Sequence, residues 1–445
     1  MSRCVVVILM TVLVALKSAA YPLDGFSTTD IHRLEAYFRA QDALLARGSL
    51  QPGSLWSIDD VKLRLADRPD FELPAPDPEF TEQIRAFLGS DEAGYGIAVL
   101  DVSDPDRPRY AEIAAERPQN PGSVGKLVIG LGWFQALADR YPDVADRARL
   151  LKNSQIRADA FIRKDSHIVP LWKPGDPKVL KRPLQEGDEA NLYTYLDWMF
   201  SASSNAAASE TLSELMVFRH AGAEYPVSAE AKAAYFDETP KVQLSKQLKE
   251  ALQGPLTRNG IDTQKLRQGK FFTREGKRRV DGPSSVATPR ELLRFALLME
   301  QGKLVDRWSS QELKRLLYLT DRRIRYASHP ALATSAVYYK SGSLYSCKEE
   351  PGFECGKYMG NRVNFLNSLA IVETKEDGRQ LHYIVALLSN VLRKNSAVEH
   401  QTLAMRIHRL IESAHPPQAA PPPAPEAPLD APNPVPDAGS GGAVP

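Results

Sequence analysis

The sequence predicts an α+β fold, an α/β-α sandwich in which both ends of the chain build one antiparallel sheet and the middle forms a helical lobe. Three observations predict it. A strand pattern occurs early, at 94–102. Three more occur late, at 335–344, 363–374 and 381–388. Between them, from about 123 to 302, the pattern is mostly helical. We expect helices to flank the sheet.

The early elements follow one another closely. Apolar residues recur at helical spacing over 31–47, and again over 77–89 after a Pro-rich stretch. The first strand then leads through an Asp- and Pro-bearing turn into a returning strand at 109–113.

The late elements end the sheet. Asp377-Gly378, a dipeptide typical of hairpin turns, joins the second and third of the late strands. A last helix is predicted over 396–413, because its apolar residues form one stripe.

The two ends of the chain lie outside this fold. Residues 1–20 have a basic start, an apolar run and a small-residue exit, which is typical of a cleaved signal peptide and predicts export to the periplasm or secretion. Residues 416–445 hold 11 of the 33 prolines and no aromatic ring, so we expect a disordered Pro/Ala-rich tail. Between them we expect an N-terminal helical extension at 21–76 and a main domain at 77–412.

The charge balance argues against a nucleic-acid partner. The chain has 56 basic and 55 acidic residues, a net charge of +1. Two basic runs stand out, at 147–182 and 265–279. They are either solvated surfaces or contacts for an anionic cell-wall polymer or membrane surface. The sequence leaves the oligomeric state open.

Cysteine and histidine usage predicts a disulfide and no metal site. Once a signal peptide is removed, Cys347 and Cys355 are the remaining cysteines, and in an exported chain such a pair predicts a disulfide. Two cysteines are too few for a Cys-rich zinc site, and the eight histidines show no metalloprotease pattern. We expect neither a metal nor a cofactor.

Ser123 and Lys126 form the first chemical motif. The segment from Asn120 resembles a phosphate-binding loop, but the positions of Asn120 and Leu127 lack the glycine and the Ser/Thr that such a loop needs. Residues three apart share a helical face, so Lys126 can reach the Ser123 hydroxyl. The apolar helix that follows predicts burial, which lowers the pKa of a lysine and lets it act as the base for a serine nucleophile.

Two further motifs follow in order. Ser-x-Asn occurs once, with Ser203 and Asn205, and Lys-(Ser/Thr)-Gly occurs once, as Lys340-Ser341-Gly342. Together with Ser-x-x-Lys, this set resembles serine β-lactamases and penicillin-binding proteins. The resemblance to the class A β-lactamase-like family extends over roughly 77–412 and includes a Thr-Pro-Arg helix start at Thr288.

The resemblance implies a role for each motif residue. Ser123 resembles the acyl-accepting nucleophile, Lys126 its base, and Ser203 the serine that passes a proton to the leaving nitrogen. The backbone N–H groups of Ser123 and Ser343 would form the oxyanion hole.

The remaining motif residues resemble substrate-binding groups. Asn205 would hydrogen-bond a substrate carbonyl. Lys340 would face the substrate carboxylate, with Ser341 and Gly342 beside it.

The family's Glu-x-x-Leu-Asn motif, whose glutamate activates the deacylating water, is absent from this sequence. Counting back from Thr288 points to Glu275 as a replacement, and counting forward from Ser203 points to Asp237 or Glu238. Without a placed base, acylation proceeds while deacylation of a β-lactam is slow.

The sequence thus predicts an exported serine hydrolase that forms an acyl-enzyme on Ser123 with a β-lactam or a related carboxylate-bearing amide. Two alternatives stay open: a D,D-peptidase or esterase acting on cell-wall peptides, and a non-catalytic penicillin-binding or scaffold protein.

Overall fold

The computed structural model describes residues 22–39, 57–319, 323–376 and 379–417. The expected signal peptide, the Asp377-Gly378 turn and the tail from residue 418 onward lie outside the described residues.

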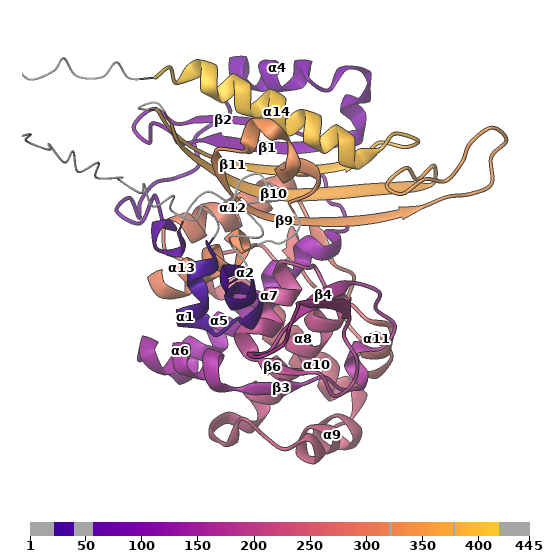
Figure 1. Cartoon of the computed structure of the whole chain (residues 1–445). Helices are drawn as coiled ribbons and strands as arrows, with labels where there is room; N and C mark the ends of the chain where they lie inside the picture. Colours follow the sequence, from indigo (N-terminus) through magenta and orange to yellow (C-terminus); the bar gives the residue numbers. More distant parts are fainter. Residues whose placement is uncertain (1–21, 40–56, 320–322, 377–378, 418–445) are drawn as a thin grey trace, which may run out of the picture.

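Five strands form one antiparallel sheet in the order β2-β1-β11-β10-β9 (Figure 1). The strands are β1 (Tyr95–Asp101), β2 (Arg109–Ile113), β9 (Ser335–Ser346), β10 (Val363–Glu376) and β11 (Arg379–Asn390). Early β1 pairs with late β11, from Tyr95 opposite Ser389 to Asp101 opposite Tyr383. The predicted α+β fold, with a sheet built from both chain ends, is confirmed.

Both faces of the sheet are apolar, which explains why helices cover both. In β1, Ile97 and Val99 belong to a core with α4 (Pro78–Ala86) and α14 (Ser396–Ala414), which lie above the sheet in Figure 1. Ala98 and Leu100 point to the other core. There α12 (Pro289–Glu300) packs against β1 and β11, and α13 (Arg307–Tyr318) against β9.

The lobe below the sheet is mostly helical, as predicted. Its helices are α5 (Lys126–Arg140), α6 (Val144–Asn153), α7 (Leu192–Phe200), α8 (Asn205–Ala221), α9 (Ala229–Glu238), α10 (Lys241–Arg258) and α11 (Arg274–Arg279). α5 is buried from Lys126 to Leu137. Its glycines permit this depth: a Cβ at Gly130 would lie 2.8 Å from the Phe200 ring, and one at Gly132 would lie 2.9 Å from the Ala251 carbonyl oxygen.

The lobe also contains three strand pairs that were not predicted. They are β3 (Gln155–Arg157) with β6 (Glu189–Asn191), β4 (Ile168–Leu171) with β5 (Leu180–Pro183), and β7 (Leu266–Arg267) with β8 (Val286–Ala287). Strands of two to four residues are too short for an alternating pattern to be recognised.

The N-terminal segment packs into the main body. It contains η1 (Pro22–Gly25), α1 (Phe26–Thr29), α2 (His32–Arg39) and η2 (Ile58–Asp60). Arg33 donates two hydrogen bonds of 2.6 Å to the Asp197 carboxylate in α7, and their side chains are 1% and 0% exposed. The backbone N–H of Leu65 donates to the Glu300 carbonyl. The domain boundary at residue 77 stays a prediction.

None of the described helices combines the length and apolar character that crossing a bilayer requires.

Candidate active site

Ser123 lies in a 3-10 turn, η4 (Gly122–Gly125), directly before α5. The Asn120 side chain holds the entry to this turn, because its Oδ1 accepts the Gly122 N–H at 2.9 Å. Lys126 is the first residue of α5, and its Nζ donates to Ser123 Oγ at 3.0 Å. The spacing of Ser123 and Lys126 therefore brings the two side chains together.

The Lys126 side chain is fully buried and surrounded by oxygen atoms. Besides Ser123, its Nζ donates to the Ser203 carbonyl at 2.7 Å and to Asn205 Oδ1 at 2.9 Å. The Ser203 hydroxyl lies 3.5 Å away. The first two motifs thus converge on one amine.

Ser203 lies in a strained loop before α8. Its φ of 56° is in the left-handed region, which is unusual for a residue other than glycine. Ser204 caps α8 through its side chain, which accepts the Ala207 N–H. Asp165 Oδ2 accepts the Ala206 N–H at 2.8 Å and the Ser204 hydroxyl at 3.1 Å. Asp165 thereby fixes the strained loop.

The carboxyl of Asp165 is held as a carboxylate. Burial favours its neutral form, but hydrogen bonds from His167 and from the Ala206 N–H outweigh burial and lower the pKa of Asp165 to about 2. His167 Nδ1 lies 2.6 Å from Asp165 Oδ1. The loop therefore depends on a permanent negative charge at neutral pH.

The third motif lies on β9. Lys340 is 3% exposed, and its Nζ donates to Ser203 Oγ at 2.9 Å. Ser203 Oγ consequently lies between the two lysines, 2.9 Å from Lys340 Nζ and 3.5 Å from Lys126 Nζ. A Cβ at Gly342 would lie 2.5 Å from the Ser123 nitrogen and 2.4 Å from the Pro121 carbonyl oxygen. Only glycine lets β9 approach the Ser123 turn this closely.

These motifs line one cleft with a cavity volume of about 520 Å³, which we call the Ser123 cleft. Its walls include Ser123, Ser203, Asn205 and 340–343. The described residues that line it contain no Asp or Glu.

Arg325, which the sequence analysis missed, also lines the Ser123 cleft. It begins η7 (Arg325–Ser328) and donates to Ser341 Oγ at 2.9 Å, Ser343 Oγ at 3.2 Å and the Tyr358 hydroxyl at 2.8 Å. No local motif marks it, since its partners are 16 to 33 residues away.

The predicted disulfide between Cys347 and Cys355 is confirmed. It closes the loop between β9 and β10, which projects beyond the sheet in Figure 1. Lys357 and Tyr358, just after the second cysteine, line the Ser123 cleft.

The acidic residues considered for deacylation lie elsewhere. Glu275 is on α11, where hydrogen bonds from Arg278, opposed by burial and supported by Arg279, lower its pKa to about 2. Glu238 ends α9 and lines a separate pocket, and Asp237 pairs with Arg279. None of the three is among the described residues that line the Ser123 cleft.

The Phe272 ring lies beside Lys126 instead. Lys126 Nζ is 4.7 Å from the ring centroid. The Ser209 hydroxyl oxygen in α8 fixes this segment by accepting the N–H groups of Phe272 and Thr273, at 3.2 and 2.9 Å. Counting back from Thr288 pointed to Glu275, which is three residues after Phe272. Glu275 lies in α11 and pairs with Arg278 and Arg279 of the same helix.

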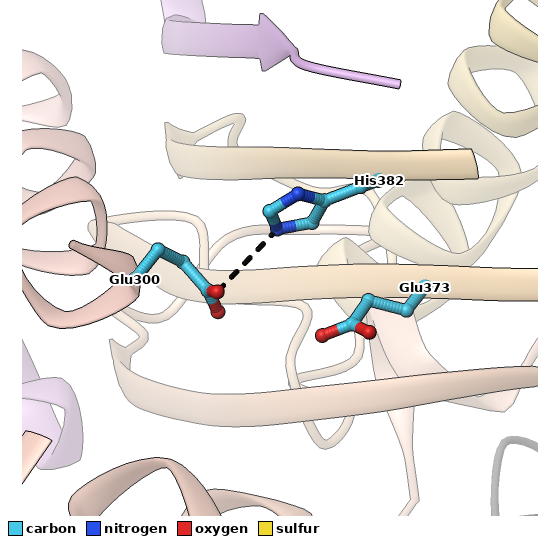
Figure 2. A group of neighbouring side chains, drawn as sticks. All are labelled: Glu300, Glu373 and His382. Atoms are coloured by element: carbon cyan, nitrogen blue, oxygen red, sulfur yellow. Dashed lines mark ion pairs between the residues drawn. The ribbon is translucent and has the colours of Figure 1, made fainter. Parts of the chain in front are cut away.

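One group of described residues has metal-ligand spacing: Glu300 on α12, Glu373 on β10 and His382 on β11 (Figure 2). The three are buried. However, the buried Lys314 ammonium lies 2.6 Å from Glu300 Oε1 and 2.5 Å from Glu373 Oε1. A cation of the protein's own thus lies between the two carboxylates. We interpret the group as an internal ion network.

A scan against protein-family models finds no match to this sequence, and a search of curated proteins finds none. Among solved structures, the chain is similar to PBP-A, with 12% identity, a TM-score of 0.47, and coverage of 77% of this chain and 99% of PBP-A. It is also similar to a β-lactamase from Sphaerobacter thermophilus DSM 20745, with 14% identity, a TM-score of 0.48, and coverage of 76% and 99%. A third similar structure is a representative class A β-lactamase from Bacteroides cellulosilyticus DSM 14838, with 15% identity, a TM-score of 0.47, and coverage of 77% and 98%.

Proposed function

We propose that this protein is an exported serine acyl-transferring hydrolase of the β-lactamase-like type, which forms an acyl-enzyme on Ser123. The observation that carries the proposal is a pair of hydrogen bonds. Lys126 Nζ donates to Ser123 Oγ at 3.0 Å, and Lys340 Nζ donates to Ser203 Oγ at 2.9 Å. The first contact allows a serine nucleophile to lose its proton, and the second allows a leaving group to gain one.

The proposed acylation gives each group a defined role. Ser123 Oγ attacks the carbonyl carbon of an amide or lactam while neutral Lys126 takes its proton. The Ser123 and Ser343 N–H groups stabilise the oxyanion. As the C–N bond breaks, Ser203 gives its proton to the leaving nitrogen and regains from Lys126 the proton that Lys126 took from Ser123. Asn205 positions the acyl part, and Lys340 with Ser341 binds a carboxylate next to the scissile bond.

Deacylation is the step for which the described cleft lining supplies no carboxylate base. Phe272 and not a carboxylate lies beside Lys126, and the described cleft lining contains no acid. This favours a penicillin-binding protein or D,D-peptidase-like enzyme over an efficient β-lactamase. The substrate class is therefore a β-lactam that acylates and stays bound, or a cell-wall peptide with a carboxylate beside the scissile bond.

Intact mass after addition of benzylpenicillin, followed over time, tests the proposal. We expect one added penicillin per chain, localised to Ser123 by peptide mapping, with slow loss of the adduct. Ser123→Ala should prevent labelling. Ser309→Ala, which changes a buried serine on α13, should label like the parent protein.

Failure of the folded parent protein to label with benzylpenicillin, a fluorophosphonate or a thioester would overturn the proposal. The non-catalytic scaffold alternative would then stand.

A further inference from the structure

One wall of the Ser123 cleft carries cations beyond those that the proposed acylation uses. The proposed acylation places one carboxylate at Lys340 and Ser341. Arg325 and Lys357 line the same cleft. Among the described residues, the contacts of Arg325 and Lys357 are with hydroxyl groups and the Tyr358 ring, and neither forms an ion pair with a carboxylate. Cations in a cleft without acidic side chains attract anions.

Tyr358 connects the two additional cations. Its hydroxyl accepts a hydrogen bond from Arg325 Nη2 at 2.8 Å, and the guanidinium carbon lies 4.6 Å from its ring centroid. Lys357 Nζ lies 5.2 Å from the same centroid. Burial raises the pKa of the Tyr358 hydroxyl, but Arg325 and Lys357 outweigh burial and lower it below its ordinary value. The potential at this position is therefore positive.

The backbone is strained at both Arg325 and Tyr358. Arg325 has a φ of 61° and Tyr358 a φ of 63°, both in the left-handed region. Such strain at residues other than glycine gathers at binding and catalytic sites, where the surrounding structure enforces it. Tyr358 lies in the β9–β10 loop, three residues after Cys355.

We propose that Arg325, Tyr358 and Lys357 form a second anion subsite, and that the preferred substrate carries two acidic groups on its leaving portion. This rests on the proposed function. The first group is the carboxylate beside the scissile bond, at Lys340 and Ser341. The second is a side-chain carboxylate, as in a D-glutamyl or D-aspartyl leaving residue, which Lys357 binds at the rim of the cleft.

The second anion subsite lies beside the place proposed for the leaving portion of the substrate. Arg325 donates hydrogen bonds to Ser341 and Ser343 on β9. Tyr358 contacts both additional cations, because its hydroxyl accepts from Arg325 and its ring centroid is 5.2 Å from Lys357 Nζ. Asn205, which would position the acyl portion, instead accepts a hydrogen bond from Lys126. The second subsite therefore extends from the proposed carboxylate site.

Two thioesters with the same benzoylglycyl acyl part test the proposal. One releases thioglycolate, with one carboxylate, and the other releases mercaptosuccinate, with two. Ser123 Oγ forms the new ester bond, the C–S bond breaks, and the free thiol is quantified with a thiol reagent. We expect a preference in kcat/KM for the mercaptosuccinate ester of about threefold to tenfold at low salt, decreasing as ionic strength rises.

Lys357→Gln should abolish this preference, mainly through KM, because a rim charge acts on binding. Lys348→Gln is the matched control, since Lys348 is an exposed lysine of the same loop outside the described cleft lining. Equal turnover of the two esters by the parent protein, or a preference that survives Lys357→Gln, would overturn the second subsite.

A binding measurement separates this inference from the proposed function. Calorimetry compares acetyl-D-alanyl-D-glutamate with acetyl-D-alanyl-D-alanine on the parent protein and on Lys357→Gln. Tighter binding of the glutamate peptide that depends on Lys357, without any acylation, would support the subsite and refute the enzyme. Acylation with equal binding of both peptides would refute the subsite alone.

Discussion

The Phe272 ring lies against Lys126, with Nζ 4.7 Å from the ring centroid. The aromatic face stabilises a cation but accepts no proton. A water molecule at this position would therefore find no carboxylate to accept its proton.

Phe272→Glu should accelerate deacylation, because it adds a carboxylate beside Lys126. A positioned general base contributes roughly 100- to 10,000-fold, and we expect at least about tenfold from a substituted residue. Time-resolved intact mass after benzylpenicillin measures the lifetime of the adduct. Phe272→Gln is the matched control, and an equal acceleration in both variants would point to water access and not to base catalysis.

Gly342→Ala should disturb both the chemistry and the fold. The added Cβ would lie 2.4–2.5 Å from backbone atoms of Pro121 and Ser123, so β9 must move away from the Ser123 turn. Overpacking of this kind costs about 1–3 kcal/mol, and we expect the rate of acylation to fall by about 100-fold. Urea unfolding and penicillin labelling measure the two effects.

Gly254→Ala is the control for this substitution. Its Cβ in α10 would meet no atom within 4 Å apart from its chain neighbours, and Gly254 is not among the described residues that line the Ser123 cleft, so acylation should stay as in the parent protein. Unchanged acylation in Gly342→Ala would contradict the close approach of β9.

Lys314→Met should strongly destabilise the protein. Lys314 is 0% exposed between Glu300 and Glu373, and its removal takes the shared cation from two buried carboxylates, of which Glu373 keeps Arg64. Breaking a buried pair costs about 3–5 kcal/mol. Lys246→Met is the exposed counterpart, because Lys246 is 77% exposed and 4.0 Å from Glu250, and we expect a change within about 0.5 kcal/mol. Equal free energies of unfolding in the two variants would contradict the ion network.

The Asp165 carboxylate predicts an acid-dependent contribution to stability. Its pKa of about 2 lies below the ordinary value of 3.8. A lowered pKa means that the contribution is fully present above pH 3.8 and is lost as the pH falls toward 2. At neutral pH it amounts to roughly 2 kcal/mol. The difference in free energy of unfolding between the parent protein and Asp165→Asn should therefore shrink between pH 4 and 2; a constant difference would refute the charged form.

The sequence was most informative where contacts are local or where a strand pattern is long. Ser123 and Lys126 meet because residues three apart share a face, and β1, β9, β10 and β11 were visible as apolar alternation. The roles assigned to the motif residues stay predictions. Asp165 and Arg325 were missed because each acts through partners that only the folded chain brings near.

Counting along the chain also failed to locate the residue beside Lys126. The loop holding Phe272 is set by Ser209, more than 60 residues earlier, and not by its distance from Thr288.

The buried pair of Arg33 and Asp197 has a practical consequence for anyone who shortens this chain. Cutting at residue 77 would retain every motif side chain yet leave the carboxylate of Asp197, 0% exposed, inside α7 without its arginine. That helix leads directly into the strained loop of Ser203. A truncated chain that fails to react would therefore say nothing about the proposed chemistry, because the segment that contains the motif residues is shorter than the segment that keeps the chain folded.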